Sequence, residues 1–232
     1  MRNTETLSAG NGGEGKFQEP IDWADVKFTL VLGILMAGVK LLELNAPMLE
    51  MRRTTTDEVA SMLVVGYILL RASRNHEKLK AWGLTVPLTS AAILTGLAML
   101  VVALGMLAIG GVVVAGTLSF TPAYVTQMVE YIPAAFPQQF VMCSVGLATL
   151  ATLRPFHGLW RLPLAVGLIF SLAHFWTPAR IPGTIIPLQM VLTFPAGFFA
   201  AFYFLKFKSI LPLTALHAIL YPLLNNWIEM QL

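Results

Sequence analysis

Long apolar runs are the feature that most constrains what this chain can fold into. Several runs of about 15 to 23 residues contain no acidic or basic side chain, which is the length a helix needs to cross a bilayer. Only 12% of the 232 residues are charged and 56% are hydrophobic, whereas soluble proteins have about 25% charged residues. A soluble core of this size cannot bury so much apolar surface. The sequence therefore predicts an all-α, polytopic bundle of transmembrane helices.

The positions of these runs predict how the chain is organised. The candidate spans lie at residues 27–45, 58–73, 86–117, 136–153, 160–177, 184–205 and 209–226. We expect about seven spans, within a range of six to eight, because the third run is too long for one simple crossing and is expected to be broken or tilted. Residues 1–20 are polar and Gly-rich, which predicts a disordered tail. Residues 21–80 then form two N-terminal helices with a basic loop, and residues 81–232 form the membrane core.

The basic residues predict the orientation and limit the partners. With the N-terminus inside, ten lysines and arginines lie at cytoplasmic positions and three lie outside. The inner set is Arg2, Lys16, Arg71, Arg74, Lys78, Lys80, Arg154, Arg161, Lys206 and Lys208, and the outer set is Arg52, Arg53 and Arg180. No basic patch interleaves with aromatic residues, so nucleic acid is not an expected partner. We expect contact with membrane lipid, in a prokaryotic cytoplasmic (inner) membrane.

Four polar side chains interrupt the apolar C-terminal half. Gln138 and Gln139 open the span at 136–153, His174 closes the next span, and His217 lies within the last one. Gln139, His174 and His217 stand 9 to 15 residues from the nearest cytoplasmic basic residue of their own helix, a depth of roughly 14 to 23 Å at the helical rise. Because polar groups deep in a span usually face a bundle interior or a wet cavity, this shared depth predicts one site between three helices.

Plainer interpretations of the polar and aromatic residues remain open. A single His or Gln within a span often only bonds to a neighbouring helix as packing support. Interfacial aromatics anchor helices at span ends, and five lie there in this sequence: Tyr131, Tyr203, Trp160, Trp176 and Trp227. We expect these five to be anchors.

Three short motifs resemble a known family. Phe170 and His174 in FSLAHF are similar to its second motif, FxxxH, and His217 in the final span is similar to the start of its third. The segment AWGLTVP at 81–87 is similar to the lead-in that often precedes the family's core. Over residues 80–226 the chain resembles the CAAX-protease and bacteriocin-processing (CPBP) family of intramembrane proteases. This resemblance implies a hydrolase fold that acts on membrane-anchored proteins or peptides, with Gln138, Gln139, His174 and His217 at the catalytic positions.

The first motif departs from the family pattern. Where the family has EExxxR, this chain has QQFVMC, so Gln138, Gln139 and Cys143 replace both glutamates and the arginine. The third motif usually continues HxxxN, but Tyr221 stands there and Asn225 follows one turn later. A general base must accept a proton, and an amide can only orient water by hydrogen bonds. The sequence therefore favours a catalytically degenerate relative, a pseudoenzyme that binds membrane-anchored proteins or peptides.

Two other functions are kept as alternatives. The first is an active peptidase with His174 as the base, since imidazole titrates near neutrality. The second is a small transporter or channel subunit, against which stands the lack of any Asp or Glu between Glu130 and Glu229. No cofactor is expected. Nor is a metal, because two histidines fall short of the usual three protein ligands of a catalytic zinc.

Overall fold

The described residues of this chain are helical. The computed structural model describes residues 22–45, 53–75, 77–116, 118–151, 153–156, 160–175, 177, 179–228 and 230. Within them there is no strand, and one isolated bridge joins Arg180 to Pro187. The all-α prediction is confirmed for this part of the chain, while the tail expected at 1–20 lies outside it.

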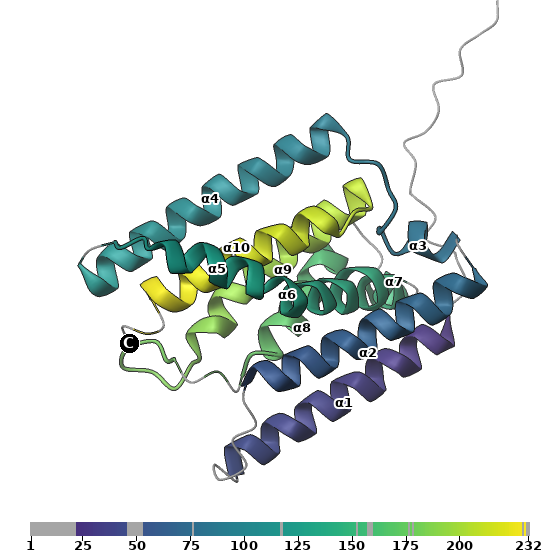
Figure 1. Ribbon diagram of the computed structural model, residues 1–232, viewed down its shortest axis with the longest axis horizontal. Helices are drawn as coiled ribbons and strands as arrows, with labels where there is room; N and C mark the ends of the chain where they lie inside the picture. Colours follow the sequence, from purple (N-terminus) through teal and green to yellow (C-terminus); the bar gives the residue numbers. More distant parts are fainter. Residues whose placement is uncertain are drawn as a thin grey trace, which may run out of the picture.

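The helices follow the predicted runs closely. The elements are α1 (Trp23–Asn45), α2 (Arg53–Arg74), α3 (Glu77–Ala81), α4 (Ser90–Ala115), α5 (Pro122–Glu130), α6 (Ile132–Gln139), the π-helical η2 (Phe140–Gly146), α7 (Leu147–Ala151), the 3₁₀ turn η3 (Arg154–Phe156), α8 (Arg161–Leu172), α9 (Leu188–Phe207) and α10 (Leu211–Trp227). Figure 1 shows α4 beside α10 on one side of the bundle and the antiparallel pair α1 and α2 on the other, with α6 to α9 between them.

Among the described residues, three helical stretches are long and apolar enough to cross a membrane. They are Ser90–Ala115, Ile132–Ala151 and Leu188–Phe207. These stretches support an integral membrane protein, but they do not confirm a count of about seven spans. The third predicted run is one unbroken helix, so the expected break is absent. This helix begins where the Thr89 hydroxyl accepts the Ala92 N–H, and it ends at Gly116, whose φ of 74° is left-handed.

The fourth span starts from a short preceding helix rather than from a loop. The basic-free stretch at 119–135 contains α5, and Tyr131 alone separates Glu130 at the end of α5 from Ile132 at the start of α6. Pro133 lies in the first turn of α6, where its missing N–H costs no hydrogen bond. The chain is therefore redirected at Tyr131, which brings that side chain toward the centre of the bundle.

Two glycines allow α8 and α9 to pack closely. A Cβ built on Gly197 would lie 3.1 Å from the Cα of Gly167 and 3.0 Å from the Cβ of Phe170. A Cβ built on Gly167 would lie only 2.7 Å from the Phe194 carbonyl oxygen of α9. Small residues at such crossings permit the van der Waals contacts that hold helices together in lipid. This contact fixes the end of α8, where His174 follows.

Gly167→Ala is therefore expected to destabilise the protein by about 1–3 kcal/mol, because the new methyl group forces the two backbones apart. Gly105→Ala in α4 is the matched control, since nothing lies within 4 Å of a Cβ at that position. That change should be neutral or stabilise by up to about 1 kcal/mol, through helix propensity. Thermal unfolding in detergent measures both variants, and equal melting temperatures for the two would contradict the packing described here.

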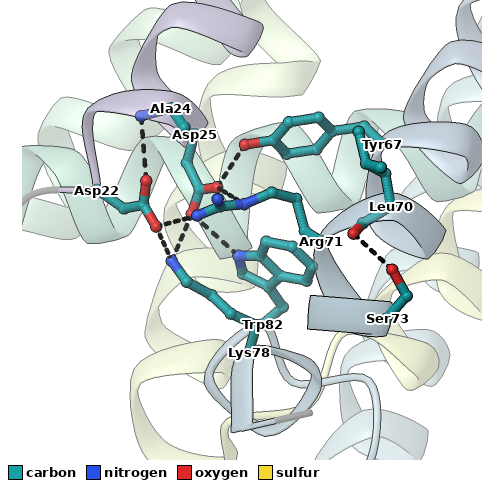
Figure 2. Close-up of polar contacts among 9 residues, drawn as sticks. All are labelled: Asp22, Ala24, Asp25, Tyr67, Leu70, Arg71, Ser73, Lys78 and Trp82. Atoms are coloured by element: carbon teal, nitrogen blue, oxygen red, sulfur yellow. Dashed lines mark hydrogen bonds and ion pairs between the residues drawn. The ribbon is translucent and has the colours of Figure 1, made fainter. Parts of the chain in front are cut away.

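A buried ionic cluster ties the N-terminal helices together (Figure 2). Asp25, only 7% exposed, accepts hydrogen bonds from Tyr67 Oη at 2.6 Å and from Lys78 Nζ at 3.1 Å. Asp22 accepts the Ala24 N–H at 3.0 Å at the start of α1 and forms ion pairs with Arg71 and Lys78. The cluster joins α1, α2 and α3, and each acid is matched by a base.

Charge balance in this cluster favours the ionised form of Asp22. Burial raises the pKa of its carboxyl, but the hydrogen bond and charge of Lys78, together with the Ala24 N–H and the charge of Arg71, lower it further. The net pKa is therefore below the usual value for Asp. The cluster therefore stabilises the fold fully at pH values above the ordinary pKa of Asp. This stabilisation is lost as the pH falls through the lowered pKa of Asp22.

Trp82, in the lead-in segment at 81–87, connects this cluster to the core. Its Nε1 donates to Asp25 at 3.3 Å, its ring meets the edge of Phe140 at 5.2 Å, and its carbonyl accepts the Ser144 hydroxyl at 2.7 Å. The next residue, Gly83, has φ 74°, and a Cβ there would lie 2.7 Å from the Lys208 carbonyl oxygen. The segment thus packs on the core through Trp82, Gly83 allows the close approach to Lys208, and the Ser144 bond supports η2 directly.

Candidate functional site

The structure brings Gln139 and His217 into direct contact. Gln139 ends α6 and is 4% exposed, and its Nε2 lies 3.1 Å from Nδ1 of His217 on α10. The thiol of Cys143, one turn along, contacts the amide oxygen of Gln139 at 3.8 Å. The amide therefore spans two helices, and both of its ends are engaged by protein.

This network also assigns the protons. With the Cys143 thiol donating to Oε1, Gln139 turns its amide nitrogen toward His217 and donates to Nδ1. The neutral ring of His217 then carries its proton on Nε2. Neither Gln139 nor Cys143 offers a carboxylate to take a proton from water here, so the pair orients His217 without supplying a base.

His174 lies just beyond the end of α8, which stops at Leu172 rather than continuing to the histidine. Its Nδ1 donates to the Phe170 carbonyl oxygen at 2.7 Å, which leaves Nε2 as the unprotonated nitrogen of the neutral ring. The Phe170 ring meets His174 with centroids 4.8 Å apart and His217 with centroids 6.3 Å apart. One aromatic ring thus contacts both predicted histidines.

Gln138 faces an aromatic group that sequence reasoning missed. Its Nε2 lies 3.5 Å from the Tyr131 hydroxyl, the limit of a hydrogen bond. Tyr131 stacks on Tyr221 with centroids 4.3 Å apart, and its ring meets His217 at 5.6 Å. The prediction that Tyr131 is an interfacial anchor is therefore wrong, because the turn after α5 directs it inward. The spacing of Tyr221, four residues after His217, was the signal that could have found this pair.

Tyr203 is not an interfacial anchor either. It is buried, and its hydroxyl donates to the Ala92 carbonyl oxygen at 3.1 Å, which joins α9 to α4. Trp227 instead donates from Nε1 to the Ser119 carbonyl oxygen at 2.7 Å. Trp160 is exposed and stacks on Phe198, which is compatible with the predicted anchor role. Trp176 lies outside the residues that the structure describes.

A π-helical segment follows the two glutamines. Its wide turns span Phe140–Gly146 and bury Phe140, Cys143 and Ser144. A Cβ on Gly146 would lie 2.9 Å from the Val141 carbonyl oxygen, so the wide turn needs glycine at that place. Such segments are rare and occur often at functional sites. Here the segment sets how the residues after Gln139 face the neighbouring helices.

A cavity of about 580 Å³ lies beside this network. It is bounded by α1, α2, the α6 to α7 helix, α8 and the first turn of α9, and its wall contains Gln138, His174, Tyr131 and Tyr221. Gln139 and His217 are not among the lining residues, so only half of the predicted set lines the cavity. Consecutive residues of a helix point about 100° apart, which explains why Gln138 faces the cavity while Gln139 faces α10.

The lining is uncharged. Apart from a few amide, hydroxyl and imidazole groups it is aliphatic or aromatic, and no Asp, Glu, Lys or Arg belongs to it within the described residues. Among those residues there is also no group of three or more His, Cys, Asp or Glu that could hold a metal ion. The cavity thus suits a ligand that is mostly apolar with neutral polar groups.

The comparisons with known proteins now bear on this site. Residues 131–221 match the family described as type II CAAX prenyl endopeptidase Rce1-like. Over this segment the chain is similar to the Rce1-like family. No curated protein and no solved structure matches the chain. The matched segment runs from Tyr131 to Tyr221, the two rings that stack on each other, and includes all four predicted site residues.

Within the Rce1-like segment, the two glutamines are expected to differ in their effect on stability. Gln139→Leu leaves Nδ1 of His217 without its donor and should destabilise the protein by about 1–3 kcal/mol. Gln138→Leu faces the cavity and removes only a 3.5 Å contact, so it should cost less than about 1 kcal/mol. Thermal unfolding of the two variants in one detergent measures the difference. A larger loss of stability for Gln138→Leu than for Gln139→Leu would contradict the assignment of Gln139 to the core and Gln138 to the cavity.

Proposed function

We propose that this protein is a CAAX-protease-like membrane protein that binds membrane-anchored proteins or peptides and does not cleave them by glutamate-based hydrolysis. One observation carries the proposal. Gln139 stands at the position of the second glutamate of the family's first motif. Its amide oxygen accepts a hydrogen bond from the Cys143 thiol, and its amide nitrogen donates to His217. A carboxylate there would accept hydrogen bonds and take a proton from water, whereas this amide is a satisfied structural link.

The cavity supports binding independently of catalysis. Its apolar walls suit the apolar part of a membrane-anchored chain, and Gln138, Tyr131 and His174 supply neutral hydrogen-bonding groups for a polar part. Mostly apolar pockets with a few placed polar groups are typical ligand sites. We also propose that residues 81–232 form the family-type core and that the helices within 21–80 are an added pair, since α1 and α2 complete the cavity wall.

The position of His174 favours a second candidate function, an active peptidase with altered chemistry. It lines the cavity, and its bond to the Phe170 carbonyl places the unprotonated nitrogen at Nε2, which is the nitrogen a general base uses. In that reaction Gln138 would orient the water. This candidate predicts activity that depends on His174 and tolerates loss of Gln139.

Purified wild-type protein in nanodiscs should bind prenylated or unprenylated membrane peptides without cleaving them. Gln138→Glu with Gln139→Glu should give measurable cleavage, because the change restores proton acceptors of nearly the same shape, and a general base typically contributes 10²–10⁴-fold. Cys143 stays unchanged in this variant, since it is 0% exposed and an arginine there would overpack the core. Mass spectrometry of the peptides is the readout. Wild-type cleavage that His174→Ala abolishes and Gln139→Ala preserves would establish the second candidate instead.

We further propose that the protein resides in a prokaryotic inner membrane with the N-terminus inside and an odd number of spans. The excess of basic residues at the predicted inner positions supports this orientation. Cysteines introduced at Thr4 and Gln231 should label from opposite sides of the membrane with an impermeant maleimide. The native Cys143 is buried and should give little background. Labelling of both positions from the same side would mean an even number of spans.

A further inference from the structure

Gln189 is a buried polar residue that the site described so far does not use. It is 3% exposed, yet its Nε2 has no hydrogen-bond partner among the described residues. It also belongs to the wall of the 580 Å³ cavity. A buried amide nitrogen without a partner is unfavourable in a folded protein, so its place in a cavity wall suggests that a ligand completes its bonding.

A hydrogen bond fixes the start of α9 beside Gln189. Gln189 is the second residue of α9, and the next residue, Met190, accepts the Ser171 hydroxyl at 2.6 Å with its carbonyl oxygen. Ser171 lies in the last turn of α8, directly before the turn that carries His174. The start of α9 is therefore fixed against the end of α8, and Gln189 and His174 line the same cavity.

The cavity specifies what kind of group the amide can bind. Nε2 is a donor, and the described lining carries no charge that would balance an anion, so the complementary group is a neutral acceptor. The hydroxyl of Thr29, on α1, lines the same cavity and is likewise without a partner among the described residues. Two residues from different helices of the cavity wall thus carry buried polar atoms without a partner among the described residues.

We propose that Gln189 is a specificity-determining residue whose amide nitrogen donates to a backbone carbonyl of the membrane peptide bound in this cavity. The inference rests on the proposed peptide-binding function and adds the side chain that would bind the peptide main chain. A peptide carbonyl is a strong neutral acceptor, and in a mostly apolar cavity its hydrogen bond to Gln189 satisfies both partners.

The test uses Gln189→Met in the full chain, reconstituted in nanodiscs, with one fluorescent membrane peptide as the probe. Binding should weaken about tenfold, the effect of losing one buried hydrogen bond. The melting temperature of the peptide-free protein should stay equal or rise, because a methionine of similar volume removes an unmatched polar group. Gln127→Met is the matched control: the Gln127 Oε1 accepts the Asn226 side chain at 2.7 Å, so that variant should melt lower and bind normally.

A thioamide scan of the peptide identifies the carbonyl. Thioamide sulfur is a weaker acceptor than oxygen, so one substituted position should weaken binding to wild type and leave binding to Gln189→Met unchanged. Equal affinity of wild type and Gln189→Met would overturn the role of Gln189, and so would a lower melting temperature of that variant. Failure of wild type to bind any peptide in the presence of the same lipids would overturn the proposed function together with this inference.

Discussion

Polar groups inside hydrocarbon must find partners within the protein, and this constraint organises the whole bundle. No water is present there to replace a missing bond, so an unsatisfied group costs several kcal/mol. The hydroxyls of Ser144, Ser171 and Tyr203 each donate to a backbone carbonyl of another segment. Each bond fixes one helix against the next. Gln139 and His217 are a further example, because Gln139 is buried and bonds to His217 on another helix.

The same constraint explains the chemistry of the Rce1-like segment. Glutamate in place of Gln139 would bring a carboxylate to a buried position, where a base such as the arginine of the family motif would stabilise its charge. In this chain Cys143 stands at the arginine position, and a neutral amide stands where the carboxylate would be. The two neutral residues are therefore consistent with each other, and with His217 they form an uncharged link between helices.

The N-terminal helices show how an ionic cluster holds one end of a helix pair. Asp22 and Asp25, at the start of α1, form ion pairs with Arg71 of α2 and Lys78 of α3. Trp82 donates a hydrogen bond to Asp25 and packs its ring against Phe140 in η2. Much of α1 beyond the cluster is exposed, while Thr29, Gly33 and Met36 line the cavity. The cluster is thus the fixed end of a helix that forms one wall of the binding space.

Sequence reasoning found the elements better than the contacts. Helices occur at every apolar run, because a span of hydrocarbon needs a helix whatever lies beside it. The aromatic anchors were partly wrong, since Tyr131 and Tyr203 lie at span ends in the sequence yet turn inward. The ionic cluster was missed because its members come from three segments that only packing brings together. The sequence did not indicate a role for Gln189, because a single glutamine at the start of a span is typical of the polar residues found at span boundaries.

What the sequence by itself determined is the class of protein: a helical membrane chain, with two glutamines where the family motif has carboxylates, and histidines at a shared depth. These follow from composition and spacing, which depend on local chemistry alone. Tertiary structure decided which polar group meets which. Gln138 and Gln139 are adjacent in sequence, but one faces the cavity and the other binds His217, because helical rotation and the packing of α10 send them in different directions.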